Sequence, residues 1–418
     1  MPRVLAYNAP ATGHILPATG VLLELRRRGL EVHVRTRGSD VEQLSALGLL
    51  ASPIDPGIEA IEFDDWQGRN QVAALDRLQR TFAARAELEI PDLREAIGEV
   101  QPDVLIVDVG CEGAAFVAEA SGLPWAQYCP YPPIFHSKDK PPYGLGLKPA
   151  RGRLGRVRDR LATVASDRTT RKHLPPLNAM RVDLGLAPLH RFDEQFLKAE
   201  RFIVFTAEPY EYPRTDWPAS VRLVGPVDWE PPERPPEWLI DETRPIVLVT
   251  ASTVHQGDDK LIATALEALC HDNVAVIATT GAQDPAAFAV PANARVERFV
   301  PHGPVLARAA CVVSHGGQGI TQKALGAGVP VCVVPFCRDQ FEVARRVEVA
   351  GAGTRLHHRR LNARRLREAV HATIAMRPGA EGVARDFARA GGSCAAADAV
   401  EELLITPPVT ASRGGIIG

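Results

Sequence analysis

Short apolar runs and amphipathic segments alternate from the first residues of the chain. Residues 3–9 form an apolar run, residues 10–14 carry turn-forming Pro and Gly, and residues 31–37 are predicted as a second strand. Between these runs, residues 15–29 repeat apolar side chains at the spacing of one helix face, namely Ala18, Val21, Leu22 and Leu25. Pro17 suits the first turn of such a helix. The pattern predicts a strand–helix–strand unit and therefore a parallel sheet.

The same pattern starts again after a proline-rich segment near the middle of the chain. Proline stiffens a chain and is excluded from sheet interiors, so we interpret residues 226–245 as a linker between two domains. Residues 1–225 and 246–405 each repeat strand–helix–strand units, which predicts two doubly wound α/β domains facing across a cleft. The last helix of the second domain is a candidate to cross back to the first domain. Residues 406–418 are predicted to form a flexible tail.

Composition narrows the classes of partner. The chain has 418 residues with 48 Lys and Arg against 50 Asp and Glu, so its net charge is close to zero and no nucleic-acid partner is expected. The seven cysteines are scattered, and several lie in apolar runs, which is typical of reduced core thiols. No segment resembles a signal peptide or a membrane-spanning run. We therefore expect a cytoplasmic, soluble protein without integral membrane association.

A glycine-rich stretch joins a strand to a helix in the second domain. His315 follows the apolar residues 311–314, and the glycines come next, at Gly316, Gly317 and Gly319. At such a junction the backbone N–H groups of the helix point outward, and glycines let a ligand approach them closely. A tight turn also needs glycine for structural reasons, but His315 could donate a hydrogen bond to a phosphate oxygen. The stretch therefore indicates an anion site.

Two polar residues are expected at the carboxyl edge of the first sheet. His14 lies in the turn after the first predicted strand, and Asp108 ends the strand predicted at residues 102–110. Removing a proton from an attacking hydroxyl group needs a base, and a neutral imidazole has a suitable pKa. A neighbouring carboxylate would fix the tautomer of this imidazole and stabilise its charged form. The alternatives are a turn or helix-capping histidine and a loop-capping carboxylate.

Four segments resemble a known family. Residues 298–306 and 311–356, together with GHILPATG near the start and PDVLIVD in the middle, are similar to bacterial glycosyltransferases of family 1, which act on natural products and glycolipids. The resemblance follows the whole chain in order. It implies a GT-B fold, with two Rossmann-like domains, and transfer of a sugar from a nucleotide-diphosphate donor. Direct displacement with His14 as the base, and Asp108 as its partner, would invert the anomeric configuration.

The resemblance also assigns the donor site to the second domain. Phe299 would stack on the nucleobase, and the backbone of Val300 would pair with the edge of the base. Asp339 and Gln340 match the pair that binds the hydroxyl groups of the transferred sugar. The residues that would hold the diphosphate are His315, Gly316, Gly317, Gly319 and Ile320, with Ser252 and Thr253 as additional hydroxyl donors.

Two positions depart from the family pattern. Ile320 stands where a threonine is usual, which removes a hydroxyl group near the α-phosphate, and the adjacent Thr321 or backbone N–H groups are the candidate replacements. Lys323 stands where users of UDP-sugars commonly carry a glutamate that accepts both ribose hydroxyl groups. Lysine only donates hydrogen bonds. A dTDP-sugar is therefore at least as plausible a donor as a UDP-sugar.

The acceptor and the further partners follow from weaker signals. The candidate acceptor wall in the first domain consists of Trp66, Phe82, Tyr131 and Phe135, which would suit a small hydrophobic aglycone and which could equally be core residues. Residues 148–172 contain nine basic residues against two aspartates, so they form either a solvated helix face or a patch for an anionic acceptor or a lipid surface.

The last expectations concern the alternative functions, the cofactors and the oligomeric state. The alternatives to a natural-product glycosyltransferase are a glycolipid glycosyltransferase at the membrane surface and a non-catalytic protein that activates a partner enzyme. No cluster of residues has the spacing of metal ligands, and the helix N-terminus could stabilise the leaving diphosphate, so we expect no metal ion and no other cofactor. The chain is expected to be a monomer or a homodimer.

Overall fold

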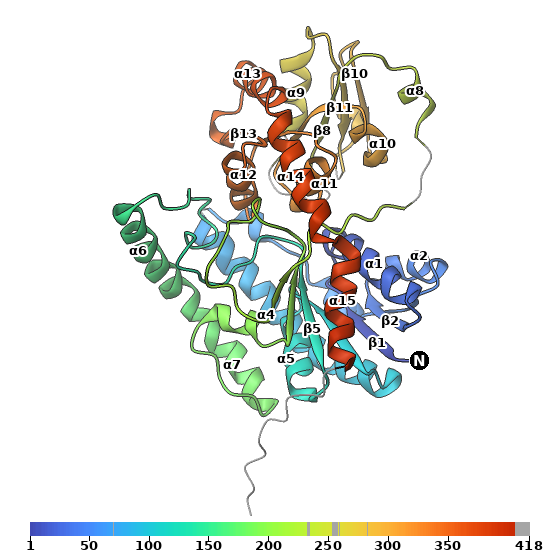
Figure 1. Cartoon of the computed structure of the whole chain (residues 1–418), viewed down its shortest axis with the longest axis vertical. Helices are drawn as coiled ribbons and strands as arrows, with labels where there is room; N and C mark the ends of the chain where they lie inside the picture. The colour runs from blue at the N-terminus through green and yellow to red at the C-terminus, as the bar shows by residue number, and fades with distance from the viewer. Residues whose placement is uncertain (70, 232–234, 253–257, 259, 282, 406–418) are drawn as a thin grey trace, which may run out of the picture.

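The computed structural model describes residues 1–418 except 70, 232–234, 253–257, 259, 282 and 406–418, so the predicted tail lies outside the described residues. Two α/β units follow one another along the long axis of the molecule, with the N-terminal unit carrying both β1 and the last helix (Figure 1). In the described part of the chain, no helix is both long and apolar enough to cross a bilayer. All seven cysteines are free thiols.

The N-terminal domain is built on a parallel sheet. Its strands, within the described residues, lie in the order β3-β2-β1-β4-β5-β6-β7, and every neighbouring pair is parallel. The strands are β1 (Arg3–Tyr7), β2 (Glu31–Thr36), β3 (Leu50–Pro53), β4 (Val104–Asp108), β5 (Trp125–Cys129), β6 (Arg201–Val204) and β7 (Val221–Leu223). The α-helices are α1 (Thr12–Arg27), α2 (Val41–Ala46), α3 (Pro56–Ala60), α4 (Gln71–Val100), α5 (Glu112–Ser121), α6 (Arg153–Thr170) and α7 (Leu174–Asp183).

The C-terminal domain repeats this architecture. Its described strands lie in the order β10-β9-β8-β11-β12-β13, again all parallel. The strands are β8 (Ile246–Thr250), β9 (Ala275–Thr279), β10 (Ala294–Glu297), β11 (Ala309–Ser314), β12 (Val331–Val333) and β13 (Gly353–Arg355). The α-helices of the linker and the domain are α8 (Glu237–Ile240), α9 (Lys260–Leu269), α10 (His302–Leu306), α11 (Gln318–Gly326), α12 (Gln340–Val349), α13 (Ala363–Ile374) and α14 (Arg377–Ala390), and the last helix is α15 (Gly392–Ile405).

The strand order fixes where ligands can bind. In each sheet the strands that follow the first one are added on one side of it, and the chain then crosses to the other side. The order reverses between β1 and β4 in the first sheet and between β8 and β11 in the second. The helices after these strands pass on opposite faces, so a crevice opens at the carboxyl ends of the two strands. Both glycine-rich and polar turns singled out in the sequence lie at these two switch points.

The first helix begins earlier than its apolar pattern predicts. Helix α1 starts at Thr12, so His14 lies in its first turn and not in a turn before it, and Pro17 lies inside the helix. In a regular helix the N–H group of residue 17 donates a hydrogen bond to the carbonyl of Gly13. Proline has no N–H group, so this hydrogen bond is missing. Gly13 is exposed, so water can bond this carbonyl group, and the helix tolerates the proline.

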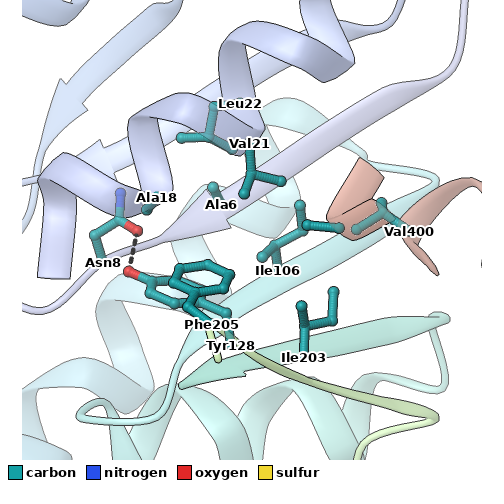
Figure 2. A pocket seen from close by; sticks show the side chains of 11 residues that line it. Ala6, Asn8, Ala18, Val21, Leu22, Ile106, Tyr128, Ile203, Phe205 and Val400 are labelled. Atoms are coloured by element: carbon teal, nitrogen blue, oxygen red, sulfur yellow. Dashed lines mark hydrogen bonds between the residues drawn. The ribbon is translucent and has the colours of Figure 1, made fainter. Parts of the chain in front are cut away.

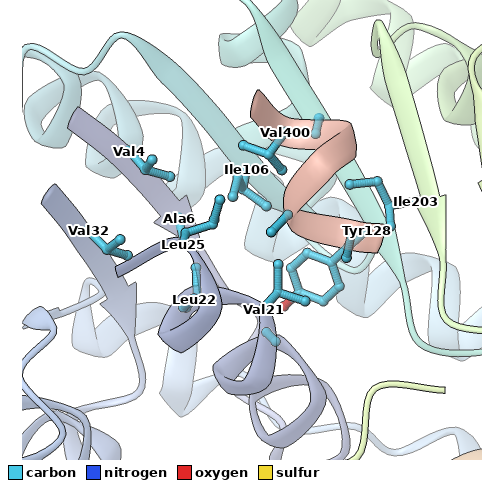
Figure 3. Packing of buried hydrophobic residues seen from close by; sticks show 14 of the residues in the cluster. Val4, Ala6, Val21, Leu22, Leu25, Val32, Ile106, Tyr128, Ile203 and Val400 are labelled. Carbon is cyan, nitrogen blue, oxygen red and sulfur yellow. The ribbon is translucent and has the colours of Figure 1, made fainter. Parts of the chain in front are cut away.

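Helix α15 belongs to the core of the N-terminal domain although it ends the C-terminal half of the chain. Its residues Ala396 and Val400 pack with Val21 and Leu22 of α1 against Ile106 of β4 (Figure 3). A cavity of about 10 Å³ lies in this core, lined almost wholly by apolar side chains (Figure 2). This volume is at the lower limit for one water molecule, so the cavity is a gap in packing and not a substrate site.

The chain crosses between the domains at two points that touch. At the first crossing, after β7, Gly225 has φ +81°; at the second, between α14 and α15, Gly391 and Gly392 have φ +94° and +57°. The backbone N–H of Gly392 donates to the carbonyl of Val224 at 2.6 Å. Only glycine adopts such φ values without strain, so three glycines mark the place where both crossings meet.

Candidate active site

A histidine–aspartate pair lies at the switch point of the N-terminal sheet. His14 extends from the first turn of α1, and Asp108 is the last residue of β4. The Nδ1 atom of His14 lies 2.8 Å from Oδ1 and 2.9 Å from Oδ2 of Asp108. The structure therefore brings together the two residues that the sequence nominated as a base and its partner.

Asp108 is fully buried in a shell of hydrogen-bond donors. Its Oδ1 accepts the N–H of Gly110 at 2.7 Å, and its Oδ2 lies 2.7 Å from the hydroxyl of Tyr128. This hydroxyl is also 2.7 Å from Oδ1 of Asn8 (Figure 2). Burial raises the pKa of Asp108, but the charge and hydrogen bond of His14 and the other donors outweigh burial, so the pKa lies below its usual range. The group is a carboxylate and accepts only.

These contacts set the state of His14. Because a carboxylate cannot donate, Nδ1 of His14 carries the proton, and Nε2 keeps its lone pair. Within the described residues Nε2 has no hydrogen-bond partner, and the ring of Tyr131 lies 5.8 Å from the imidazole. Burial lowers the pKa of His14, but Asp108 outweighs it, so the pKa lies above the ordinary value. The ring is therefore oriented as a base with a partly exposed acceptor atom.

The second switch point carries the glycine-rich turn. His315 and Gly316 follow β11, and Gly317 is the N-cap of α11. Gly316 has φ +99°, and a Cβ there would lie 2.7 Å from Val333, so this turn needs glycine for its own geometry. Around Gly319, in contrast, a Cβ would meet no atom of the described residues within 4 Å. Among the described residues nothing fills the space beside Gly319 in the first turn of α11, where a ligand could approach the backbone.

Several buried polar atoms near this turn have no partner among the described residues. They include Nδ1 of His315 and Nε2 of Gln318, which can donate hydrogen bonds but make none; Nδ1 of His315 lies 4.0 Å from Oδ2 of Asp258, within ion-pair distance. Burial lowers the pKa of His315, so its ring is neutral at neutral pH. Unpaired buried donors are costly, and a ligand with oxygen acceptors would satisfy them. Together with the helix N-terminus they favour a ligand that carries anionic oxygens.

Thr321 is one of the two predicted replacements for the missing hydroxyl group. Its side chain is fully buried inside α11, and its Oγ1 has no hydrogen-bond partner among the described residues. Ile320 is partly buried against the core of the domain. Because adjacent helical residues point about 100° apart, Thr321 cannot take the direction of Ile320. Backbone N–H groups are left as the donors at this point of the turn.

The predicted base platform is accessible. Phe299 follows β10 and is 58% exposed, with its ring stacked at 6.5 Å on that of His302. Val300 is buried in the core of the domain, so its side chain fixes the position of the neighbouring Phe299. Ser252 is buried after β8, and its N–H donates to Asp258. Thr253 lies outside the described residues.

Lys323 is neutralised by the linker, which the sequence did not predict. Its Nζ lies 2.6 Å from Glu230 and 3.1 Å from Asp228. Glu230 also accepts the N–H groups of His302 and Gly303, both at 3.2 Å. Burial raises the pKa of Glu230, but Lys323 outweighs it and holds the pKa below its usual range. The linker thus places two carboxylates beside Lys323, where the family pattern has a glutamate. The only sign of this contact in the sequence was the presence of acidic residues in the proline-rich segment.

The loop before α12, in the C-terminal domain, contacts the N-terminal domain. Arg338, at φ +49°, binds Asp65 of the N-terminal domain through two hydrogen bonds of 2.8 and 2.5 Å. Burial is the main cause that raises the pKa of the next residue, Asp339, and the charges of Asp339 and His14 act on each other's pKa. The charge of Asp339 therefore acts on His14 from the other domain.

Gln340 does not face this space. It is 1% exposed, and its Oε1 accepts the N–H groups of Phe336 and Cys337 at 2.7 and 3.0 Å. The prediction that its amide touches the sugar therefore finds no support in this conformation. An amide oxygen that receives two backbone donors holds the loop in place, and the loop in turn positions Asp339.

Helix α12 carries a further set of contacts between the domains. Oε1 of Glu342 accepts the N–H groups of Gly144 and Gly146 at 3.0 and 2.8 Å. Arg346 is fully buried and pairs with Glu211 at 2.7 Å and with Glu342 at 2.9 Å. Burial raises the pKa of Glu211, but Arg346, helped by a second arginine, outweighs it and brings the pKa to about 2. No periodicity in the sequence indicated this network.

The four aromatic candidates divide into two groups. Tyr131 lies beside His14, Trp66 is 45% exposed directly after the Asp65 that binds Arg338, and Phe82 is half-buried against Phe63. Phe135 was wrongly predicted to line the acceptor site. It is buried in the core among Phe202 and Trp217 because its segment turns inward before α6.

Among the described residues, no three or more His, Cys, Asp or Glu side chains converge as metal ligands would.

Comparison with known proteins identifies the family. The model of the "Erythromycin biosynthesis protein CIII-like, C-terminal domain" matches residues 261–401. The 4′-demethylrebeccamycin synthase of Lentzea aerocolonigenes is 34% identical over 389 residues, which cover 89% of this chain and 91% of the relative. This chain belongs to the bacterial family 1 glycosyltransferases. A rhamnosyltransferase of PGL/p-HBAD biosynthesis from Mycobacterium bovis is 37% identical over 201 residues, 48% of this chain and 44% of that relative.

Solved structures agree with the fold of this glycosyltransferase. CalG4, the calicheamicin glycosyltransferase, superposes with a TM-score of 0.73 at 23% identity, covering 97% of this chain and 100% of that chain. The glycosyltransferase of kitacinnamycin gives a TM-score of 0.74 at 24% identity, covering 96% and 99%. The predicted GT-B fold is confirmed, and the chain is a glycosyltransferase. The alternative of a non-catalytic activator is not retained.

Proposed function

We propose that this enzyme moves a sugar from a dTDP- or UDP-sugar to a hydroxyl group of a small hydrophobic natural product, with inversion and with His14 as the general base. The observation that carries the proposal is the His14–Asp108 pair, in which Nδ1 is held by a carboxylate while Nε2 is unpaired among the described residues. The charge of Asp339, on the opposite domain, raises the pKa of His14. A hydroxyl group placed between them would meet a base on one side and the sugar on the other.

The proposed reaction is a direct displacement. Nε2 of His14 takes the proton of the acceptor hydroxyl group while its oxygen forms a bond to the anomeric carbon. The bond from this carbon to the diphosphate oxygen breaks, and the nucleoside diphosphate leaves with the electron pair. Asp108 stabilises the imidazolium that forms. The N-terminus of α11 and the unpaired donors of His315 and Gln318 support the proposal that the leaving charge is stabilised without a metal ion.

The donor is proposed from the nucleoside side of the site. Phe299 offers an exposed ring to a base, and such stacking tolerates different bases. Lys323 cannot accept a ribose hydroxyl group, and Glu230, its carboxylate partner, already receives three donors. Asp228, the other carboxylate beside Lys323, is 52% exposed and can still accept a hydroxyl group, so these contacts support a dTDP-sugar and a UDP-sugar as donors alike.

One pair of measurements tests the base. His14→Ala should abolish transfer, while the affinity for dTDP and UDP, measured by calorimetry, stays within about twofold of the unchanged enzyme. Proton NMR of the product should show the anomeric configuration opposite to that of the donor. Treatment with EDTA should leave the rate unchanged. Full turnover by His14→Ala, or retention of configuration, contradicts the proposed mechanism, and a requirement for added metal contradicts the proposed stabilisation of the diphosphate.

A further inference from the structure

Helix α6 exposes the side that a surface helix normally buries. It contains no buried residue, and its large apolar side chains point to solvent, with exposed fractions of 88% for Leu154, 56% for Val157, 66% for Leu161 and 47% for Val164. These four residues follow the spacing i, i+3, i+7 and i+10, so they form one continuous stripe. Figure 1 shows α6 at the rim of the N-terminal domain. We call these four residues the apolar stripe.

The polar side of the same helix is turned toward the protein. Asp159, Thr163, Ser166 and Asp167 are each partly covered, whereas every member of the apolar stripe is exposed. Asp167 pairs with His136, which precedes the helix, at 3.2 Å. A helix that simply covered the domain would have the opposite orientation, because burying its apolar side is the main source of its stability. The orientation leaves the apolar stripe available for a surface that is not part of this chain.

Cationic side chains flank the apolar stripe. Exposed arginines occur along the helix and just before it, and within the described residues none of the following has an ion pair: Arg151, Arg153, Arg156, Arg160 and Arg168. Arg158 alone on this helix is paired, with Asp159. The exposed side of α6 therefore combines apolar side chains with several uncompensated positive charges. A two-fold contact between two copies of this side would bring like charges together.

We propose that α6 docks on an anionic phospholipid surface, with the apolar stripe inserted at the level of the headgroups and the arginines bound to lipid phosphates. Helices that combine an apolar stripe with flanking cations lie in the plane of a membrane interface. Each basic residue near an anionic leaflet adds to the attraction, and salt weakens it. The docking is peripheral and reversible. It suits a glycolipid acceptor and equally an aglycone dissolved in the bilayer, so it does not depend on the acceptor proposed above.

Vesicle flotation of the full-length enzyme tests this docking. The protein should float with vesicles of phosphatidylcholine that contain about one third phosphatidylglycerol, and less of it should float with pure phosphatidylcholine. Salt at about 0.5 M NaCl should lower the binding to the anionic vesicles, because it screens the attraction. Leu161→Glu should lower the partition coefficient at least about tenfold, because it places a charge inside the apolar stripe. Arg156→Glu with Arg160→Glu should lower it similarly for anionic vesicles only.

The matched control lies elsewhere on the surface. Ile240 of α8 is exposed to 68%, like Leu161, but has no such apolar stripe, so Ile240→Glu should leave flotation unchanged. Circular dichroism and transfer to a water-soluble acceptor should be unchanged in all variants. Absence of binding to anionic vesicles, or unchanged binding by Leu161→Glu, overturns the proposal. Light scattering that shows a dimer dissociated by Leu161→Glu overturns it too and assigns the apolar stripe to a second copy of the chain.

Discussion

Replacing Asp108 with asparagine should test the orientation of the base separately from its presence. The carboxylate receives the Nδ1–H of His14, the N–H groups of Gly110 and Ala9, and the hydroxyl of Tyr128, at distances from 2.7 to 3.3 Å. An amide offers one oxygen and one NH₂ group, so its NH₂ must face some of these donors. Where it faces His14, the imidazole takes the other tautomer, with the proton on Nε2 and no lone pair for the acceptor.

The expected loss is that of the whole base contribution. A positioned general base contributes about 10²–10⁴-fold, or roughly 2.7–5.4 kcal/mol of barrier at about 1.36 kcal/mol per tenfold change. We expect kcat for Asp108→Asn to fall by this factor, while the Kd for the nucleoside diphosphate changes less than about threefold, because Asp108 lies in the other domain. Steady-state kinetics and calorimetry measure the two quantities. Tyr128→Phe, which removes one donor but keeps the carboxylate, is the matched control and should lose less than about tenfold.

The pH profile gives a second readout of the same contact. Asp108 raises the pKa of His14 above its ordinary value, so the active neutral form is lost as pH falls through this raised pKa. In Asp108→Asn the negative charge is gone, so the acidic limb of the kcat profile should move to lower pH. If Asp108→Asn keeps more than a tenth of kcat and its acidic limb stays in place, the assignment of Asp108 as the partner of the base is refuted.

The remaining predictions concern stability and the donor site. Arg346→Met should lower the free energy of unfolding by about 3–5 kcal/mol in urea titration, since it takes a buried cation away from two buried carboxylates and leaves Glu342 without one, whereas Arg364→Met at an exposed pair should cause no measurable change; equal effects would contradict the argument. Phe299→Ala should weaken nucleoside diphosphate binding about tenfold to hundredfold by calorimetry, with the acceptor KM unchanged, and unaltered affinity would remove the ring from the base site. Thr321→Val should leave donor affinity within about twofold, because its hydroxyl group is buried in the helix, and a larger loss would show that it reaches the ligand.

The placement of His14, Asp108 and His315 could be predicted because it follows from topology. Alternating strands and helices specify a parallel sheet, and the residues after its switch-point strands must lie at one edge. His14 and Asp108 meet for this reason although 94 residues separate them. His315 reaches the open turn of α11 for the same reason. Such a prediction needs only local patterns and one handedness rule.

The contacts between the domains could not be predicted in the same way. The pair of Arg338 and Asp65 joins residues 273 positions apart, and its partners lie on loops whose direction no periodicity encodes. Lys323 is an example of such a contact. In the sequence it stands as a lone cation, whereas in the folded chain its charge is compensated by Glu230. The predicted contact of Gln340 with the sugar has no support for a related reason. An amide next to a turn can accept hydrogen bonds from the nearby backbone, as Gln340 does, and its oxygen is then not free for a ligand.

The glycines at the two domain crossings have a mechanical consequence. Because Val224 and Gly392 are hydrogen-bonded to each other, the two connections share one pivot and do not form two separate struts. Left-handed glycines on both sides of this pivot, Gly225 and Gly391, adopt new φ values at little cost. A rotation about this point leaves α15 fixed on the N-terminal domain and moves the loop of Asp339 relative to His14. The same rotation would have to break the contacts of Arg338 with Asp65 and of Arg346 with Glu211, so these ion pairs, and not the glycines, resist it.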